Sequence, residues 1–171
     1  MASWKGKPVT STDYIAEDLN DLDRAHFCAA GAILWRKRNG EPFTLMAVEQ
    51  REAPRGKIVE RYNFLGGKRD SYEETARDVA ARECWEETGM LLASSTYDKI
   101  KQHAAPVCFC STSKYALFIQ EVGPEDADLA ERLAATGRPP NLTNDPNLLR
   151  IEWVALRRLI DRHWRKHNLH A

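Results

Sequence analysis

The sequence of 171 residues lacks an excess of charge of either sign, because 25 Lys and Arg residues balance 25 Asp and Glu residues. It also lacks a long apolar run: the longest, residues 28–35, is far shorter than the roughly 20 residues that a membrane-spanning helix needs. The balanced charge excludes a protein that coats nucleic acid through bulk positive charge. The short apolar runs lead us to expect no membrane partner.

Cysteine is scarce, and the four residues are Cys28, Cys84, Cys108 and Cys110. Four cysteines are too few for a disulfide scaffold in a chain of this size, and the paired CxxC spacing of a structural zinc site is absent. The N-terminus has no apolar segment of the kind found in signal peptides. We therefore expect reduced cysteines and a cytoplasmic, intracellular protein. A mature secreted protein that had lost its leader would have the same features.

The length and composition indicate one compact domain. Apolar residues make up 43% of the chain and charged residues 29%, which is typical of a globular protein. Residues 1–25 are polar and acidic, and we interpret them as an N-terminal extension with at most one short helix. Residues 26–171 are then expected to form a single domain.

The apolar pattern predicts strands and helices that alternate irregularly. Asn39-Gly40 is typical of a hairpin turn, Gly66-Gly67 is expected to break the chain, and residues 50–62 are interpreted as a charged connection. The irregular order, with hairpins, favours an α+β fold, an α/β/α sandwich around a mixed sheet, over a doubly wound parallel sheet. The predicted strands are 27–35, 43–48, 106–111, 115–122 and 151–154; the predicted helices are 72–88, 125–135 and 156–167; and 137–147 is a predicted loop.

The helix predicted over 72–88 has recognisable start and stop signals. Ser71 is a suitable N-cap, and Glu74, three residues later, would complete a capping box. Gly89 is a natural residue at which a helix ends.

Three carboxylates of this helix project toward its apolar side. Glu83 and Glu87 fall on that side and Glu86 lies at its edge. Like charges one turn apart repel each other, burial increases the repulsion, and acids at a helix C-terminus oppose the macrodipole. Arg82 could brace one of them, and a hard divalent cation such as Mg²⁺ or Mn²⁺ could compensate the rest. A solvated acidic helix end is the competing interpretation. The apolar side is defined by Ala76, Val79, Ala80 and Cys84.

Residues 67–90 resemble the Nudix box, the signature of the Nudix hydrolase family. The run from Arg82 to Met90, RECWEETGM, follows Glu74 at the spacing of the pattern G-x5-E-x7-R-E-U-x-E-E-x-G-U, where U is a bulky aliphatic residue. Two departures occur. Six residues instead of five separate Gly67 from Glu74, so the loop has one extra residue, and Cys84 occupies a U position.

The resemblance implies a Nudix-type α/β/α sandwich in which the box forms a loop–helix–loop motif. It also implies a pyrophosphohydrolase that cleaves phosphoanhydride bonds with Mg²⁺ or Mn²⁺ as cofactor. Glu83, Glu86 and Glu87 would be metal-binding and catalytic, the carbonyl of Gly67 or its neighbour Gly66 a further ligand, and Arg82 would orient Glu83. One of these glutamates, or an acid outside the box, would act as general base. The outside candidates are Asp145 and Glu152.

Basic residues cluster on either side of this motif. The functional interpretation is a substrate with more phosphate than a metal alone can neutralise. Solvated, ion-paired faces are the competing interpretation, since acidic residues are interleaved with the first cluster. The first cluster, our predicted substrate-binding set, is Arg51, Arg55, Lys57, Arg61, Lys68 and Arg69; the second is Arg157, Arg158, Arg162, Arg165 and Lys166.

Substrate identity is left open by the sequence. Candidates are nucleoside diphosphate derivatives, dinucleoside polyphosphates and diphosphoinositol polyphosphates, so we expect a small phosphate-rich partner, with RNA possible but not favoured. A non-catalytic ligand- or RNA-binding module on the same scaffold, or an mRNA-cap hydrolase, are the alternatives. The chain could be a monomer or a homodimer. Possible base-stacking residues, each more often a packing residue, are Trp35, Tyr62, Phe64 and Trp85.

Overall fold

The computed structural model describes residues 27–110, 112–137 and 147–161, together with Arg165 and Leu169. Several predicted features lie outside the described residues: the extension at 1–25, most of the loop at 137–147 including Asp145, and the basic residues Arg162 and Lys166.

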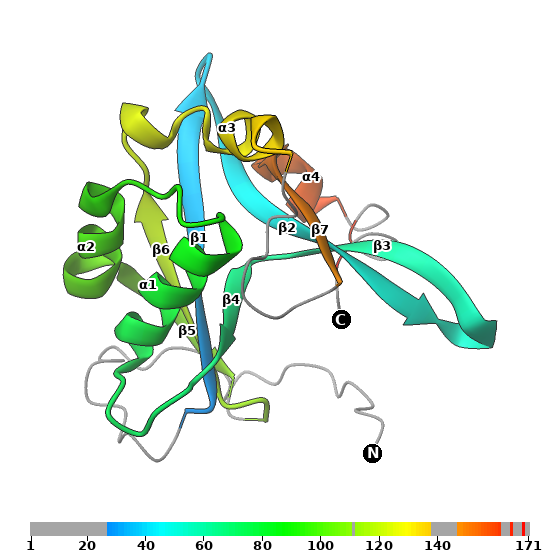
Figure 1. The fold of residues 1–171 in the computed structure, drawn as a ribbon, viewed down its shortest axis with the longest axis horizontal. Coiled ribbons are helices and arrows are strands. Elements are labelled where there is room, and N and C mark those ends of the chain that lie inside the picture. The colour runs from blue at the N-terminus through cyan, green and yellow to red at the C-terminus, as the bar shows by residue number, and fades with distance from the viewer. Residues whose placement is uncertain (1–26, 111, 138–146, 162–164, 166–168, 170–171) are drawn as a thin grey trace.

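A seven-stranded mixed sheet forms the centre of the molecule (Figure 1). Its main path runs β3-β2-β1-β6-β5, with β4 paired to β1 and β7 paired to β2. The β1–β6 pair is parallel and the other pairs are antiparallel, which confirms the predicted mixed sheet. The strands are β1 (Ala29–Arg38), β2 (Glu41–Ala53), β3 (Lys57–Asn63), β4 (Leu65–Lys68), β5 (Ala105–Cys110), β6 (Tyr115–Glu121) and β7 (Leu148–Ala155).

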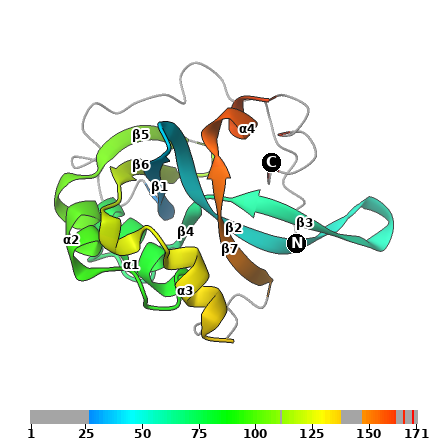
Figure 2. The same ribbon diagram turned by 90° about the horizontal axis from the view of Figure 1, so that it is seen from above.

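The longer helices lie together on one face of the sheet, and the short last helix lies on the other side (Figure 2). Helix α1 packs on β1 and β4, α2 packs on α1, and α3 packs on β7. Within the described residues, no helix is both long and apolar enough to cross a membrane. The helices are α1 (Ala76–Glu87), α2 (Ser94–His103), α3 (Leu129–Ala135) and α4 (Leu156–Ile160), with 3-10 turns at Pro54–Gly56 and Pro124–Asp126.

The core lies between α1 and the central strands. Alternate residues of β1, Ala30, Ala32 and Leu34, are fully buried against the helix side of the sheet. The apolar side predicted for α1 is buried there too, including Val79 and Cys84. Because these helix residues are small, the helix can approach the sheet closely.

The strand predictions hold for the central sheet and fail for residues 50–62. Asn39 and Gly40 form the expected turn, with φ of 51° and 80°. The predicted connection is instead the end of β2 and all of β3, joined through Pro54–Gly56. The prediction was wrong because this ribbon projects from the body (Figure 1) and carries charged residues on both faces. It therefore lacks the apolar stripe that would have predicted strands.

The start of α1 was also predicted wrongly. Thr75 is the N-cap, and Asp78 completes the reciprocal capping box. Glu74 is not part of this cap, because its Oε2 accepts the backbone N–H groups of Asp70 and Ser71 at 2.9 and 3.3 Å and so closes the preceding loop. Gly89, with φ of 66°, ends the helix as predicted.

The structure also differs from the predictions at β4, α2 and α4. Gly66-Gly67 does not break the chain but lies within β4. Helix α2 was not predicted, because only Thr96 and Ile100 of it are buried and its apolar stripe is therefore narrow. The helix predicted over 156–167 is interrupted: α4 ends at Ile160, Asp161 has an extended backbone, and Arg165 is again helical.

Candidate active site at the end of helix α1

Strand β4 brings two glycines against the carboxylates of α1. The N–H of Gly66 donates to Glu87 Oε2 at 2.9 Å. A Cβ at Gly67 would lie closer than 3.0 Å to the Glu83 carboxyl group. Because neither position carries a side chain, the strand backbone and the two carboxylates can meet directly. The predicted juxtaposition of Gly67 with these glutamates is therefore present.

Arg82 connects the helix, the preceding loop and β4. Its Nη1 donates to Glu83 Oε1 at 2.8 Å and to Glu86 Oε2 at 3.4 Å. Its Nε donates to Glu74 Oε1 at 2.8 Å, and its Nη2 to the carbonyl of Lys68 at 2.8 Å. The side chain is only 19% exposed. The sequence suggested that Arg82 contacts Glu83. This contact is one of four hydrogen bonds by which Arg82 holds this end of the site together.

Arg82 compensates the negative charge of Glu83 only in part. Burial raises the pKa of Glu83; Arg82 acts against this, whereas the charges of Glu86 and Asp70 add to it. For Glu74 burial also acts to raise the pKa, but hydrogen bonds from Arg82 and from two backbone N–H groups bring it below its ordinary value. One arginine therefore satisfies Glu74 more fully than it satisfies the helix carboxylates.

The donor set suits a hard divalent cation. Carboxylate and backbone carbonyl oxygens are the ligands that Mg²⁺ and Mn²⁺ prefer, and burial, with a smaller contribution from the charges of Glu86 and Asp70, raises the pKa of Glu83. In the part of the chain that the structure describes, no three acidic, histidine or cysteine side chains converge closely enough to hold an ion. Glu83 and Glu86 are instead turned toward Arg82. The chemistry of these oxygen ligands therefore fits Mg²⁺ or Mn²⁺.

Four predicted substrate-binding residues lie on the β2–β3 ribbon, residues 49–63, which we call the arm (Figure 1). The register pairs Glu49 with Arg61, Arg51 with Val59, and Ala53 with Lys57, so these six side chains share one face. Arg55 lies at the tip with φ of 73°. One face of the arm therefore gathers Arg51, Lys57 and Arg61, while the other carries Glu52 and Glu60.

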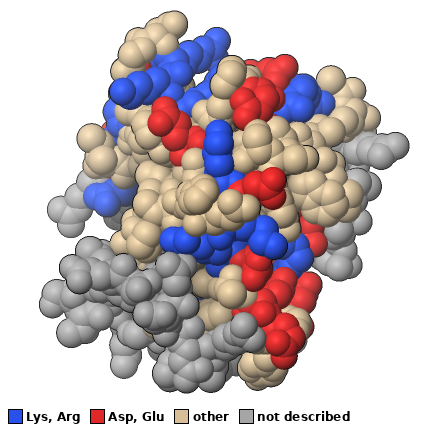
Figure 3. All heavy atoms as spheres, turned by 90° about the vertical axis from the view of Figure 1, so that its left-hand side faces the viewer, with Lys and Arg blue, Asp and Glu red and all other residues tan. Residues whose placement is uncertain are grey.

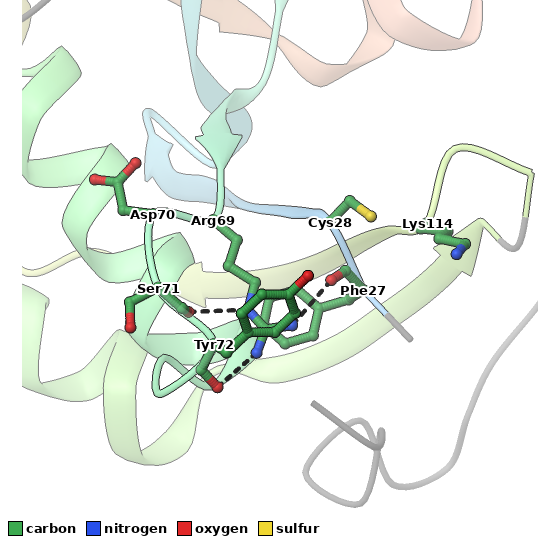
Figure 4. Close-up of a pocket in the computed structure, with 7 residues that line it drawn as sticks. All are labelled: Phe27, Cys28, Arg69, Asp70, Ser71, Tyr72 and Lys114. Atoms are coloured by element: carbon green, nitrogen blue, oxygen red, sulfur yellow. Dashed lines mark hydrogen bonds between the residues drawn. The ribbon is translucent and has the colours of Figure 1, made fainter. Parts of the chain in front are cut away.

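Arg69 is held by its own loop (Figure 4). Its guanidinium lies between the rings of Phe27 and Tyr72, 4.4 and 4.8 Å from their centroids. It donates to the carbonyls of Phe27, Ser71 and Tyr72 at 3.2, 3.0 and 2.6 Å. These contacts line a hollow of about 310 Å³ beside Cys28 and Lys114. Lys68, by contrast, is exposed on β4.

The remaining predicted residues have other partners or pack against the core. Glu152 pairs with Arg150 at 3.4 Å, and Arg157 pairs with Glu41 at 3.0 Å. Trp85 packs partly buried against the core, and Trp35, Tyr62 and Phe64 are half-buried. On the face of the molecule in Figure 3, acidic and basic side chains lie interspersed, so the balanced composition is also mixed in space there.

Sequence reasoning missed Asp70 and Tyr115. Asp70 Oδ2 lies 3.5 Å from Arg82 Nη1. Tyr115, at the start of β6, has its hydroxyl beside Gly31 and Gly66. No local signal could have indicated Tyr115, because its neighbours come from strands about 50 and 85 positions earlier in the chain.

A family model described as the NUDIX domain matches residues 26–170. No curated protein matches the chain. Among solved structures, the Nudix hydrolase RenU from M. smegmatis is 18% identical, with a TM-score of 0.43, covering 85% of this chain and 77% of that one.

Two further structures are similar at the same level. The C. elegans Ap4A hydrolase binary complex is 18% identical, with a TM-score of 0.40, covering 77% of this chain and 82% of that one. The T. brucei MERS1–RNA complex is 19% identical, with a TM-score of 0.45, covering 81% and 54%. Similarity this distant carries no information about the substrate of this chain.

Proposed function

The chain belongs to the Nudix hydrolase family, and from that premise we propose that it uses a divalent metal to cleave a phosphoanhydride bond in a phosphate-rich substrate. The activity is that of a Nudix pyrophosphohydrolase. The observation that supports it best is the meeting of Glu83 and Glu87 with the glycines of β4, braced by Arg82.

In this proposal Glu83, Glu86 and Glu87, with a carbonyl of Gly66 or Gly67, hold Mg²⁺ or Mn²⁺. The bound cation supplies charge neutralisation at the diphosphate oxygens. Arg82 fixes the rotamers of Glu83 and Glu86 through its two Nη1 contacts. One of the carboxylates accepts the proton of the attacking water. Because Gly66 and Gly67 have no side chains, the backbone of β4 can approach the carboxylates closely.

The test is a substrate panel assayed with Mg²⁺, with Mn²⁺ and with a chelator. The panel covers nucleotide sugars, dinucleoside polyphosphates, capped RNA and diphosphoinositol polyphosphates. We expect metal-dependent release of phosphate or nucleotide from at least one small member, abolished by the chelator. Metal-independent binding without turnover across the panel would replace this proposal with the binding-module alternative.

We further propose that the basic face of the arm, with Lys68, Arg55 and Arg69, binds phosphate groups beyond the scissile bond. The register supports this, since Arg51, Lys57 and Arg61 share one face with a single acid, Glu49, while Glu52 and Glu60 lie on the other face. Arg51 forms an ion pair with Glu49 on this same face, and the test replaces the two other basic residues of the face, Lys57 and Arg61.

Replacing Lys57 and Arg61 together by Gln should raise KM for the preferred substrate. Exposed charge contacts contribute about 0.2–1 kcal/mol each, so we expect an increase of roughly 2- to 30-fold for the pair, shrinking at high salt. Steady-state kinetics at two ionic strengths measures it. The matched control replaces Arg157 and Arg158 of α4 by Gln and should leave KM unchanged. An equal effect in both variants would contradict a specific role for the arm.

A further inference from the structure

The strand register places Tyr115 on the face of the sheet opposite to the one that α1 covers. Ala29 pairs with Lys68 on one side and with Tyr115 on the other. Paired residues in adjacent strands point to the same face, and the next residues along, Ala30 and Ala116, are buried on the α1 side. Lys68, Ala29 and Tyr115 therefore form one row across β4, β1 and β6 on the opposite face.

Two opposed glycines make room for the Tyr115 hydroxyl. Gly31 of β1 pairs with Gly66 of β4 in the row next to Ala29. A Cβ at either glycine would lie closer than 3.0 Å to Tyr115 Oη. The hydroxyl thus occupies a notch that any other residue at these two positions would fill. The notch directs the end of the phenol toward β4, the strand that carries Gly66 and Lys68.

Gly66 connects the notch to the carboxylates of α1. The N–H of Gly66 donates to Glu87, so Gly66 lies between that carboxylate and the Tyr115 hydroxyl. A tyrosine hydroxyl keeps its proton at physiological pH and can therefore donate a hydrogen bond.

We propose that Tyr115 is a substrate-binding residue whose hydroxyl donates a hydrogen bond to a non-bridging oxygen of the diphosphate. Lys68, in the same row, places its ammonium group on the same face and supplies the cation for that group. This inference rests on the proposed function and names the residue that orients its substrate.

The test uses the whole protein and a probe that cannot be hydrolysed, methylenediphosphonate with Mg²⁺. Tyr115→Phe keeps the ring and removes only the hydroxyl. We expect roughly 10- to 150-fold weaker binding by calorimetry, the range of one lost hydrogen bond to a charged group. Turnover of the panel substrate should fall by a similar factor in kcat/KM. The control, Tyr97→Phe on α2, should bind the probe as the wild type does.

A second measurement does not depend on the variant's folding. Wild-type protein containing 3-fluorotyrosine should show a fluorine resonance, assigned to residue 115, that shifts when the probe is added. Wild-type affinity in Tyr115→Phe, or an unmoved resonance at saturating probe, would overturn the inference. If the wild type binds the probe but hydrolyses no substrate, the proposed function fails while the role of Tyr115 in binding is still decided. If the wild type does not bind the probe at all, both fail.

Discussion

Replacing Glu87 by Gln should lower kcat at least about 100-fold, because a catalytic metal ligand carries more of the activity than the outer groups whose loss costs about 10- to 100-fold. Gln has nearly the shape of Glu, and its side-chain carbonyl can still accept the N–H of Gly66. The change therefore removes charge and leaves the contact to β4. Glu86→Gln should lower kcat in the same way, because the Glu86 carboxylate is part of the proposed metal site. Its Oε2 accepts a hydrogen bond from Arg82 at 3.4 Å.

The measurement is kcat with saturating Mg²⁺ on the best substrate of the panel. Glu131→Gln, on the exposed side of α3, is the matched control and should keep wild-type turnover. If Glu86→Gln and Glu87→Gln both kept wild-type turnover, the hydrolase proposal would be wrong.

We expect Glu83→Gln to change the stability of the metal-free protein and its activity in opposite directions. Because the folded-state pKa of Glu83 is raised, ionising it costs folding free energy as the pH rises above the ordinary range of a glutamate. Without metal, Glu83→Gln should therefore gain stability over the wild type as the pH increases, and the difference should vanish in acid, where both side chains are neutral. Thermal unfolding across pH measures this. Loss of activity with retained stability would separate function from folding.

Arg82→Ala should lower the free energy of unfolding by about 2 kcal/mol, somewhat less than the 3–5 kcal/mol typical of breaking a fully buried pair. The substitution leaves Glu74 and Glu83, whose side chains are 19% and 14% exposed, without their cation. It also removes the donor to the Lys68 carbonyl that holds the loop to the helix.

The pH dependence of this loss follows from Glu74. Its pKa is lowered in the folded state, so its pairing stabilises the protein above the ordinary pKa of a glutamate, and that contribution disappears as the pH falls through the folded-state pKa. The effect of Arg82→Ala should therefore be largest near neutrality. Urea denaturation at pH 7 and in acid tests it. Arg150→Ala, a half-exposed arginine paired with Glu60 and Glu152, is the control and should cost less. An equal loss in the two variants would contradict the central role of Arg82.

Local chemistry made several features predictable from the sequence. The Asn39-Gly40 turn and the end of α1 at Gly89 depend on backbone preferences of the residues themselves. The contacts of Arg82 with Glu83, its neighbour in the chain, and with Glu86, one helical turn later, depend on residues close together in the sequence. The family itself was visible in a single stretch, residues 67–90, and the NUDIX model matches the chain over 26–170.

Competition between similar local signals explains the errors. Ser71 with Glu74 and Thr75 with Asp78 both have the capping-box spacing, and the tertiary contact of Glu74 with Arg82 leaves the second pair to cap the helix. The arm was missed because a ribbon exposed on both faces has no apolar periodicity.

The sequence by itself therefore determined the family, the helix with its carboxylates and the arginine that braces them, because each depends on residues within one or two helical turns. Only the tertiary structure decided which face of the arm is basic and where Tyr115 lies. Both depend on strand register, which joins residues tens of positions apart and reverses every side chain if it slips by one. The meeting of Gly31, Gly66 and the Tyr115 hydroxyl has no counterpart in any local pattern, since three separate strands must pair in register to form it.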